Sequence, residues 1–424
     1  MSYLSDLLPH RSDYADFNKV WRHDVIAGIT VGIVALPLAL AFGITTGAGA
    51  RAGLITAIFA GFIAAIFGGS NYQVSGPTGA MTVVLIPIVI KYGTASLAPL
   101  GLLAGAMVIL MGVTHCGGLI KRVPWPVMEG FTLGIALVIA MQQLPSVLAT
   151  RSVSGPNTLV TAWRTVRAAI AAGVHWSSLL ILIITLLVKF AYPKISRSLK
   201  IKIHIPASFV AIIFATLLVA TFSIRTPLIG NLPRSLYVHV SLSASHIGTS
   251  ALFIGAIQIA LLAAIESLLS ARVADQMVHI HESAQSYKPN RELVGQGFAT
   301  MVSAMVGGMP ATGAIARTSV NIRSKAASRI SAITHAAFLL LVVLVLNPVI
   351  VHIPTAALGA VLIGTSYRIA SPGNLMEMLK TTRLHAAVLL ITAVLVVVIG
   401  LIWAIAISTA GYAVATAVLK RRKK

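Results

Sequence analysis

Acidic side chains are the scarcest feature of this sequence. Only 10 of its 424 residues are Asp or Glu, and charged residues of both signs make up 10% of the chain. A soluble globular domain carries a charge on about a quarter of its residues, so this composition excludes an ordinary soluble domain. Cys116 is the single cysteine, which excludes an intrachain disulfide and a cysteine-based metal centre. The first 24 residues are polar and lack the apolar core of a signal peptide.

Motifs of enzymes and of ATP-driven pumps are also missing. We find no glycine-rich phosphate loop at a strand-to-helix junction, no serine nucleophile and no acid–base constellation. The segment 279–282 (His-Ile-His-Glu) looks like a set of metal ligands, but no further ligand lies near it in the sequence. A solvated loop is the better interpretation. The sequence therefore predicts a protein that is not an enzyme and that uses neither a metal nor a cofactor.

Long apolar runs account for most of the chain, which is 57% hydrophobic with a mean hydropathy of +0.91. A helix that crosses a bilayer needs about 17–25 apolar residues, and fewer where it is broken. We count fourteen runs, near 24–44, 51–67, 78–90, 99–115, 126–144, 176–190, 206–222, 251–273, 292–306, 313–324, 330–347, 355–368, 384–398 and 400–419. The third and tenth are too short to be identified by hydropathy alone, and they are counted because the two halves of the chain repeat a short motif there. We predict an all-α polytopic membrane protein with 14 transmembrane segments.

The runs fall into two equal sets around a central loop. Residues 24–222 and 251–419 each contain seven runs, and the loop 223–250 connects them. A cytoplasmic segment (1–23) and a basic tail (420–424) flank the two sets. An odd number of spans turns the second set over relative to the first, which is the condition for an inverted repeat.

Basic residues predict the orientation. The net charge of +22 would suggest nucleic acid in a soluble protein, but here Lys and Arg lie mostly between apolar runs, so we expect no such partner. With the N-terminus in the cytoplasm, 24 of the 32 Lys and Arg lie inside, 7 lie outside, and Arg317 lies within a run. The positive-inside rule then predicts a plasma (inner) membrane protein with both termini cytoplasmic. The tail is expected to contact anionic lipid, and the longest outer loop, 145–175, to contain some helix.

A short motif occurs twice, about half the chain apart. Gly76–Met81 (GPTGAM) and Pro310–Ile315 (PATGAI) share a Thr-Gly-Ala core, and each follows a Gly-Gly pair and leads into a short run. A break in a spanning helix is tolerated only where it is buried in protein or lines a polar cavity. Paired breaks in two halves indicate the binding site of a secondary transporter, although two ordinary turns with a common tripeptide would look the same.

The helices that begin at the two breaks would direct free N–H groups and positive dipole ends at one place. This arrangement predicts an anion site without a metal. Its expected residues are the first ones of each short run, Thr78, Gly79, Ala80, Gly313, Ala314 and Ile315.

Two charged residues lie deep in apolar runs. Glu266 is in the eighth run, and a carboxylate at that depth is a functional candidate, here for proton coupling. Arg317, at the tenth run, is its expected partner and adds positive charge to the anion site. The alternative is a structural pair that joins two helices. Ser270, one turn after Glu266, either faces the same cavity or is a helix-packing hydroxyl.

Four stretches resemble the SulP anion-transporter (sulfate permease) family, and together they cover nearly the whole chain. They are Asp24–Gly28 with Ala35–Gly43, Gly76–Gly79, Glu266–Asp275, and Gly313–Arg323. The last of them is the most specific.

The resemblance implies the fold of uracil permeases. Two inverted seven-helix repeats would intertwine into a core (spans 1–4 and 8–11) and a gate (spans 5–7 and 12–14), and the core would move as an elevator against the gate. The substrate would bind between the half-helices of spans 3 and 10, in contact with Phe42, Thr78, Glu266, Ala316 and Arg317.

Two features depart from the family pattern. Most members continue into a cytoplasmic STAS domain, whereas this sequence ends at its basic tail. Bicarbonate-transporting members build a sodium site with a small residue at the position of Arg317, and a guanidinium there would repel sodium. Proton coupling through Glu266, or anion exchange, fits better.

The expected function is secondary active transport of a small inorganic anion, sulfate or bicarbonate. Three alternatives stay open: a dicarboxylate substrate, a nucleobase–proton symporter of the same fold, and a passive anion channel. The expected partners are the anion, a proton and the lipid bilayer, with a homodimer as one open oligomeric state.

Overall fold

The computed structural model is mostly helical and describes residues 6–14, 17–118, 123–153, 155, 157–199, 205–230, 248–278, 287–370, 375–377, 380 and 382–422. The helices before the central loop are η1 (Arg11–Tyr14), α2 (Phe17–Thr45), α3 (Ala50–Ile55), the π-helical turn η2 (Thr56–Ala60), α4 (Gly61–Phe67), α5 (Gly79–Tyr92), η3 (Thr94–Ser96), α6 (Leu97–Val113), α7 (Trp125–Gln142), α8 (Leu144–Val147), α9 (Thr158–Ala172), α10 (Trp176–Ser198) and α11 (Ala207–Thr221). The helices after it are α12 (Thr249–Val278), α13 (Pro289–Met305), α14 (Ile315–Arg323), α15 (Ile330–Ile350), α16 (Thr355–Ala370), α18 (Arg383–Ile399) and α19 (Leu401–Arg422). Two short strands, β1 (Ser75–Gly76) and β2 (Thr312–Gly313), complete the fold.

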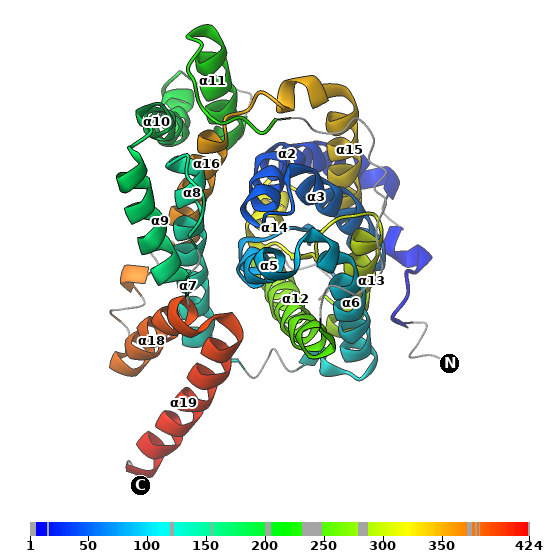
Figure 1. The fold of residues 1–424 in the computed structure, drawn as a ribbon. Helices are drawn as coiled ribbons and strands as arrows, with labels where there is room; N and C mark the ends of the chain where they lie inside the picture. Colours follow the sequence, from blue (N-terminus) through cyan, green and yellow to red (C-terminus); the bar gives the residue numbers. More distant parts are fainter. Residues whose placement is uncertain are drawn as a thin grey trace.

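The helices form two groups that lie side by side (Figure 1). The compact group contains α2–α6 and α12–α15, and the lateral group contains α7–α11, α16, α18 and α19. Within the compact group, α6 packs on α13 and α2 on α15; within the lateral group, α7 packs on α18 and α10 on α16. The groups meet where α2 contacts α11 and α16, where α5 contacts α7, and where α12 contacts α19.

Glycines allow the closest helix pairs to form. A methyl group at Gly105 of α6 would lie 2.7 Å from the carbonyl oxygen of Gly297 in α13, which is closer than real Cβ atoms come. Gly28 lies equally tight against the backbone of α15, and Gly130 against that of α18. The hydrophobic effect does not drive helices together in lipid, so their association depends on van der Waals packing. Small residues strengthen this packing because they let two backbones approach closely.

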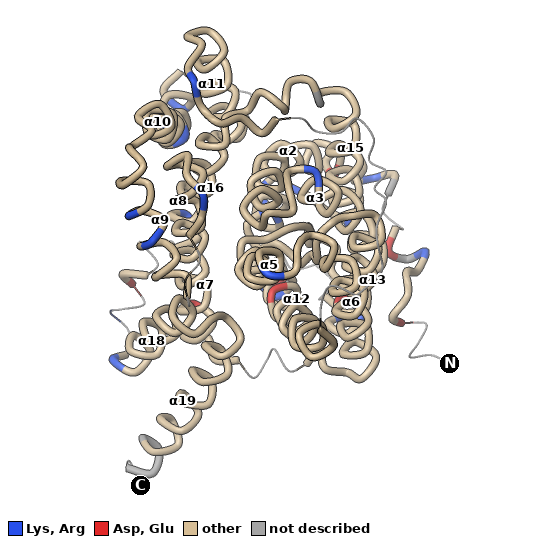
Figure 2. The backbone as a smooth tube through the Cα atoms, in the orientation of Figure 1, with Lys and Arg blue, Asp and Glu red and all other residues tan. Residues whose placement is uncertain are grey.

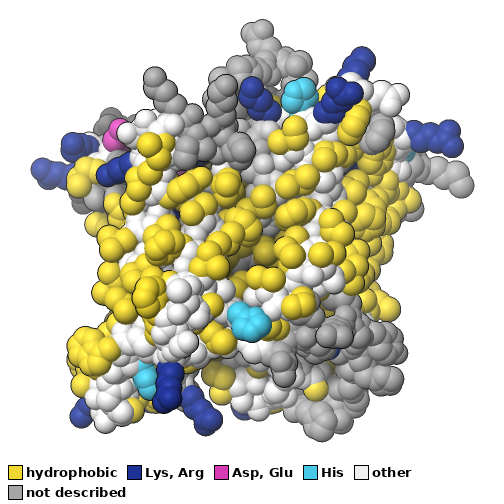
Figure 3. Space-filling model, turned by 90° about the horizontal axis from the view of Figure 1, so that it is seen from above, with side chains coloured by type: hydrophobic (Ala, Val, Ile, Leu, Met, Phe, Trp, Pro, Cys, Tyr) yellow, Lys and Arg dark blue, Asp and Glu magenta, His cyan; other side chains and the backbone are white. Residues whose placement is uncertain are grey.

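The surface agrees with a membrane environment. Among the described residues, seven helices are long and apolar enough to cross a bilayer, and further apolar helices are shorter. Lys, Arg, Asp and Glu are sparse along the helices (Figure 2), and hydrophobic side chains form a broad central band with Lys and Arg near its margins (Figure 3). Every predicted apolar run overlaps a helix, and the third and tenth runs are the short helices α5 and α14. The prediction of a helical membrane protein is confirmed.

The predicted outer loop 145–175 does contain helix, as expected. Asn157 caps α9, because its side-chain oxygen accepts a hydrogen bond of 2.9 Å from the N–H of Val160. Gly173, with φ of 93°, ends the helix in a conformation that favours glycine.

Two charged residues at the ends of predicted apolar runs are buried in helices. Lys189 belongs to α10, which extends to Ser198, and its ammonium donates to the carbonyl of Val361 (2.6 Å) and the hydroxyl of Thr365 (2.8 Å). Neighbouring α16 thus supplies the partners that make a buried lysine tolerable. Asp24 of α2 is fully buried as well, and it accepts the N–H groups of Ala327 and Ser328. Hydropathy and charge do not reveal such partners.

Two buried ionisable side chains hold the chain where α4 ends. One carboxylate oxygen of Glu292, in α13, accepts hydrogen bonds from the N–H groups of Gly69 (2.8 Å) and Ser70 (3.1 Å). The guanidinium of Arg329 donates to the carbonyl of Ile66 at 3.0 Å. These side chains satisfy backbone groups that a broken helix leaves without partners inside a membrane. Glu292 begins a predicted run and Arg329 lies between two predicted runs, and the sequence indicates neither contact.

Asp13, in the N-terminal segment, extends this network. Its carboxylate lies 2.6 Å from the guanidinium of Arg291 and 3.7 Å from that of Arg329. Partial burial raises the pKa of Asp13, but the hydrogen bonds from Arg291 and from the N–H of His10, together with the two positive charges, outweigh burial and lower the pKa to about 2. The carboxylate is therefore ionised at neutral pH and ties η1 to α13.

Candidate functional site

The two broken segments meet at the centre of the compact group. Strands β1 and β2 pair antiparallel, with Ser75 opposite Gly313 and Gly76 opposite Thr312. Helices α5 and α14 begin immediately after these strands, so their N-terminal ends lie on either side of one crossing point. The sequence prediction that two Gly-rich breaks come together is confirmed in this respect.

The two helix starts differ in how many N–H groups they leave unbonded. Thr78 is the N-cap of α5, and among the described residues the N–H groups of Gly79 and Ala80 have no partner. On the other side, the N–H of Gly313 donates to the hydroxyl of Ser267 (3.0 Å) and that of Ala314 to the carbonyl of Val74 (3.0 Å). The expectation that Gly313 and Ala314 offer free donors is wrong, because α14 begins only at Ile315.

The donors of the second helix start therefore begin one or two residues further along the chain. The N–H groups of Ile315, Ala316 and Arg317 lie in the first turn of α14 and have no partner among the described residues. Ile315 and Ala316 are partly exposed. Two N–H groups of α5 and three of α14 are thus left without a partner in the part of the chain that the structure describes.

Glu266 reaches this crossing from α12. One of its carboxylate oxygens accepts hydrogen bonds from the hydroxyls of Thr78 and Thr312, both at 2.7 Å. The two hydroxyls are themselves 3.1 Å apart. The carboxylate therefore joins both breaks through one oxygen, which leaves the other oxygen available at the site.

The expected ion pair between Glu266 and Arg317 is not formed among the described residues. The guanidinium of Arg317 donates through Nη2 to the carbonyl of Pro77 at 2.7 Å, and its Nη1 lies against Gly76 without a hydrogen-bond partner. The side chain is only 1% exposed. The two charges separate because Arg317 extends along β1, while Glu266 approaches from the side of the threonine hydroxyls.

Phe42 and Ile139 cover the start of α5. The space next to the α-carbon of Gly79 is filled by the side chain of Ile139 from α7, and an atom built there would lie 3.3 Å from the ring of Phe42. A larger residue than glycine would not fit. The structure thus brings Phe42, Thr78 and Gly79 together, and Ile139 joins them from the lateral group.

Ser270 contacts Thr318, not Glu266. Its hydroxyl lies 3.1 Å from that of Thr318, which in turn accepts the N–H of Val74 at 3.1 Å. This is the helix-packing contact of the two alternatives that we considered, and a part for Ser270 in proton coupling stays a prediction.

Sequence reasoning missed Thr312, although a signal was present. Thr312 holds the same place in the second Thr-Gly-Ala motif as Thr78 does in the first. Extending the repeat argument from Thr78 to its counterpart would have predicted two hydroxyls at one carboxylate. Ile139, in contrast, is one apolar residue among many and carries no such signal.

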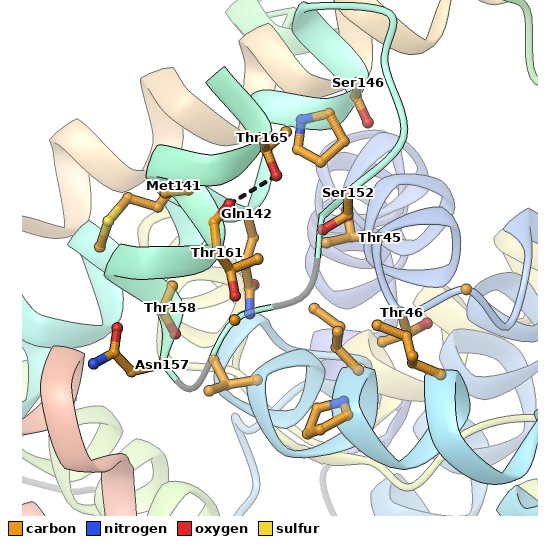
Figure 4. Close-up of a pocket in the computed structure, with 18 of the residues that line it drawn as sticks. Thr45, Thr46, Met141, Gln142, Ser146, Ser152, Asn157, Thr158, Thr161 and Thr165 are labelled. Carbon is orange, nitrogen blue, oxygen red and sulfur yellow. Dashed lines mark hydrogen bonds between the residues drawn. The ribbon is translucent and has the colours of Figure 1, made fainter. Parts of the chain in front are cut away.

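A cavity of about 900 Å³ lies between the two groups, next to the site. Polar side chains from α2, α7, α9 and the segment before α9 face it, among them Thr45, Gln142, Thr158 and Thr161 (Figure 4). Its lining also includes Val83 and Pro87 of α5. Within the described residues, no cluster of three or more His, Cys, Asp or Glu could hold a metal. The segment 279–282 lies outside the described residues.

Comparison with known proteins agrees with the resemblance in the sequence. The family model described as "Sulfate permease family" matches residues 21–392. The chain is 36% identical to YvdB of Bacillus subtilis over 91% of its own length and 72% of that protein. It is 30% identical to the bicarbonate transporter BicA of Picosynechococcus over 80% of its own length and 60% of that protein.

A solved structure has the same fold. The transmembrane domain of a cyanobacterial bicarbonate transporter, BicA, superposes with a TM-score of 0.81 at 27% identity, over 92% of this chain and 98% of that domain. The family match covers most of the chain, and the motifs at both breaks lie inside it. The chain is therefore a member of the sulfate permease family.

Proposed function

We propose that this protein is a secondary active transporter of a small inorganic oxyanion, sulfate or bicarbonate. The observation that carries the proposal is the buried guanidinium of Arg317, which has no carboxylate partner among the described residues and lies beside two helix starts. A buried cation without a counter-ion is costly. An anion at the crossing would offset that cost and accept the free N–H groups. The family name and the naming of BicA favour sulfate and bicarbonate as substrates.

The compact group acts as the moving core and the lateral group as the gate. This assignment is supported by the location of Phe42, Thr78, Glu266 and Arg317, which all belong to the compact group. A core that holds the whole set of polar ligands can carry the anion without exchanging them. Elevator movement then requires only the contacts between the two groups to change.

Two inverted repeats of seven spans are supported by matched helix contacts. In such a repeat α2 corresponds to α12, α6 to α15, α7 to α16 and α10 to α18. The contact between α2 and α15 then has its counterpart in the contact between α12 and α6, and the contact between α7 and α18 in that between α16 and α10. All four pairs are in contact, as are α10–α11 and its counterpart α18–α19. Such a set is expected of two halves with the same internal packing. We accordingly propose 14 spans and cytoplasmic termini.

Glu266 is our candidate for the coupled proton. A monovalent anion that crosses with one proton makes the loaded carrier electrically neutral, which spares about 2.3 kcal/mol per charge per 100 mV of opposing potential. The two threonine hydroxyls can donate to the ionised carboxylate or to the carbonyl oxygen of the protonated acid, so the site tolerates both forms. Exchange of one anion for another is the competing mode.

Uptake of labelled sulfate and bicarbonate into proteoliposomes tests the proposal. The wild type should accumulate at least one of them saturably, whereas a channel would only equilibrate it. Arg317→Met, which removes the charge but keeps much of the volume, should weaken anion binding about tenfold or more, equivalent to about 1.4 kcal/mol. Arg323→Met, at the exposed end of the same helix, is the control and should bind normally. A well-folded Arg317→Met protein with unchanged anion affinity would place the site elsewhere.

A further inference from the structure

The end of α7 is hydrogen-bonded to two helices of the compact group. The hydroxyl of Thr82 in α5 donates to the side-chain carbonyl of Gln142 at 2.8 Å, and the hydroxyl of Thr45 in α2 donates to that of Gln143 at 3.3 Å. Gln143 is almost fully buried. Two consecutive residues of the lateral group thus hold two separate helices of the compact group.

One turn before the glutamines, α7 makes an apolar contact with the site itself. Ile139 fills the space beside Gly79, and its carbonyl accepts the side-chain amide of Gln143 at 3.2 Å. Residues 139, 142 and 143 share one face of a helix because they are three and four positions apart. This face, which we call the α7 barrier (Ile139, Gln142 and Gln143), is therefore a continuous surface against α2 and α5.

The barrier lies between the cavity and the candidate site. Gln142 extends from α7 into the cavity (Figure 4), and Thr45 lines the same cavity. Thr82 is one helical turn beyond Thr78, which contacts Glu266. A solute in the cavity therefore has the bond between Thr82 and Gln142, and then Ile139 on Gly79, between itself and the carboxylate.

We propose that the α7 barrier closes the anion site toward this cavity, and that it separates from α2 and α5 in every transport cycle. The proposal rests on the function proposed above. A hydrogen bond of this kind adds little net stability to the closed arrangement, because the glutamine and threonine side chains can bond to water once they separate. Ile139 adds an apolar plug that excludes water and ions while the groups are in contact. The closed barrier is thus stable, and only a small free energy is needed to open it.

Reversible cross-linking in a Cys116→Ser background tests the proposal. Thr82→Cys with Gln142→Cys, treated with a short bifunctional methanethiosulfonate, should lock α5 to α7. Uptake of labelled sulfate or bicarbonate should fall at least tenfold and recover when dithiothreitol releases the linker. Thr45→Cys with Gln143→Cys locks α2 to α7 and should behave in the same way. If the first double variant folds poorly, this second pair tests whether α7 must separate from the compact group during transport.

A matched pair within the lateral group serves as the control. The hydroxyls of Ser178 in α10 and Thr226 after α11 lie 3.3 Å apart, so the same reagent should link cysteines at these positions without joining the two groups. Uptake by this linked protein should equal that of its reduced form. Full uptake by the linked 82–142 or 45–143 protein would overturn the proposal, as would failure of both pairs to link while the control pair links. Absence of uptake by the wild type would instead reject the proposed function.

Discussion

The charged residues at the crossing are held by neutral hydrogen-bond partners, and not by opposite charges. Glu266 accepts two threonine hydroxyls, and Arg317 donates to the carbonyl of Pro77. An ion pair between them would neutralise the site, and an anion would then have to compete with Glu266 for the guanidinium. Separate partners leave the positive charge available and let the carboxylate change its protonation state independently.

This arrangement leads to a prediction for Glu266→Gln. The amide oxygen of glutamine can still accept the hydroxyls of Thr78 and Thr312, so the protein should fold, bind anion and exchange it. It should lose the accumulation that an inward pH gradient drives, because an amide does not bind the coupled proton. The measurement is uptake into proteoliposomes with only pH differing across the membrane. Glu129→Gln, at a partly buried carboxylate of α7, should keep this accumulation. If Glu266→Gln still concentrates anion, its carboxylate is structural.

Helices of the compact group depend on backbone contact for their stability. The pair of α6 and α13 places Gly105 against the carbonyl oxygen of Gly297, so any side chain at position 105 forces the helices apart. Close packing is the main source of association between helices in lipid, and a forced separation affects contacts along the whole pair.

We expect Gly105→Ala to destabilise the protein by about 1–3 kcal/mol, the usual cost of overpacking. Gly411→Ala in α19 is the matched control, because it also lies within a helix but has nothing within 4 Å of the added methyl. That control should be neutral, or slightly stabilising since alanine favours a helix more than glycine does. Thermal unfolding in detergent, followed by loss of the monodisperse peak, measures both. Equal midpoints for the two variants would show that the α6–α13 contact relaxes without cost.

On the scale of the whole molecule, the distribution of basic residues distinguishes the two sides that would face opposite sides of the membrane. With the proposed orientation, 24 of the 32 Lys and Arg lie on the cytoplasmic side and 7 outside. The cavity between the groups then opens outward, because its lining includes residues near 45–47, 145–165 and 397–400, which belong to outer ends of spans. The orientation therefore decides which side the α7 barrier closes.

Cysteine labelling checks this orientation. In a Cys116→Ser background, Ser152→Cys should react with a membrane-impermeant thiol reagent added to intact cells, and Ser198→Cys should not. Both positions are exposed, so burial does not explain a difference between them. Permeabilised cells should label both and provide the control. The opposite pattern would reverse the proposed orientation and move the α7 barrier to the cytoplasmic side.

The sequence by itself determined the class of protein, the approximate positions of the helices and the two breaks that meet in the fold. The length of an apolar run and the charge of a loop are properties of consecutive residues. They therefore predict the helices and their orientation without knowledge of the fold. The Thr-Gly-Ala repeat located the crossing of β1 and β2 for the same reason, since consecutive Gly and Pro residues are enough to break a helix.

Only the tertiary structure decided the partners of the buried polar groups. Glu266 meets Thr312 instead of Arg317 because of the direction from which α12 approaches the breaks, and Lys189 is tolerated in α10 because α16 offers a carbonyl. The α7 barrier depends on the contact of two helix groups whose residues are about 60 to 100 positions apart in sequence. Hydrogen bonds need a distance of about 3 Å and a direction, and neither quantity is fixed until the helices have packed.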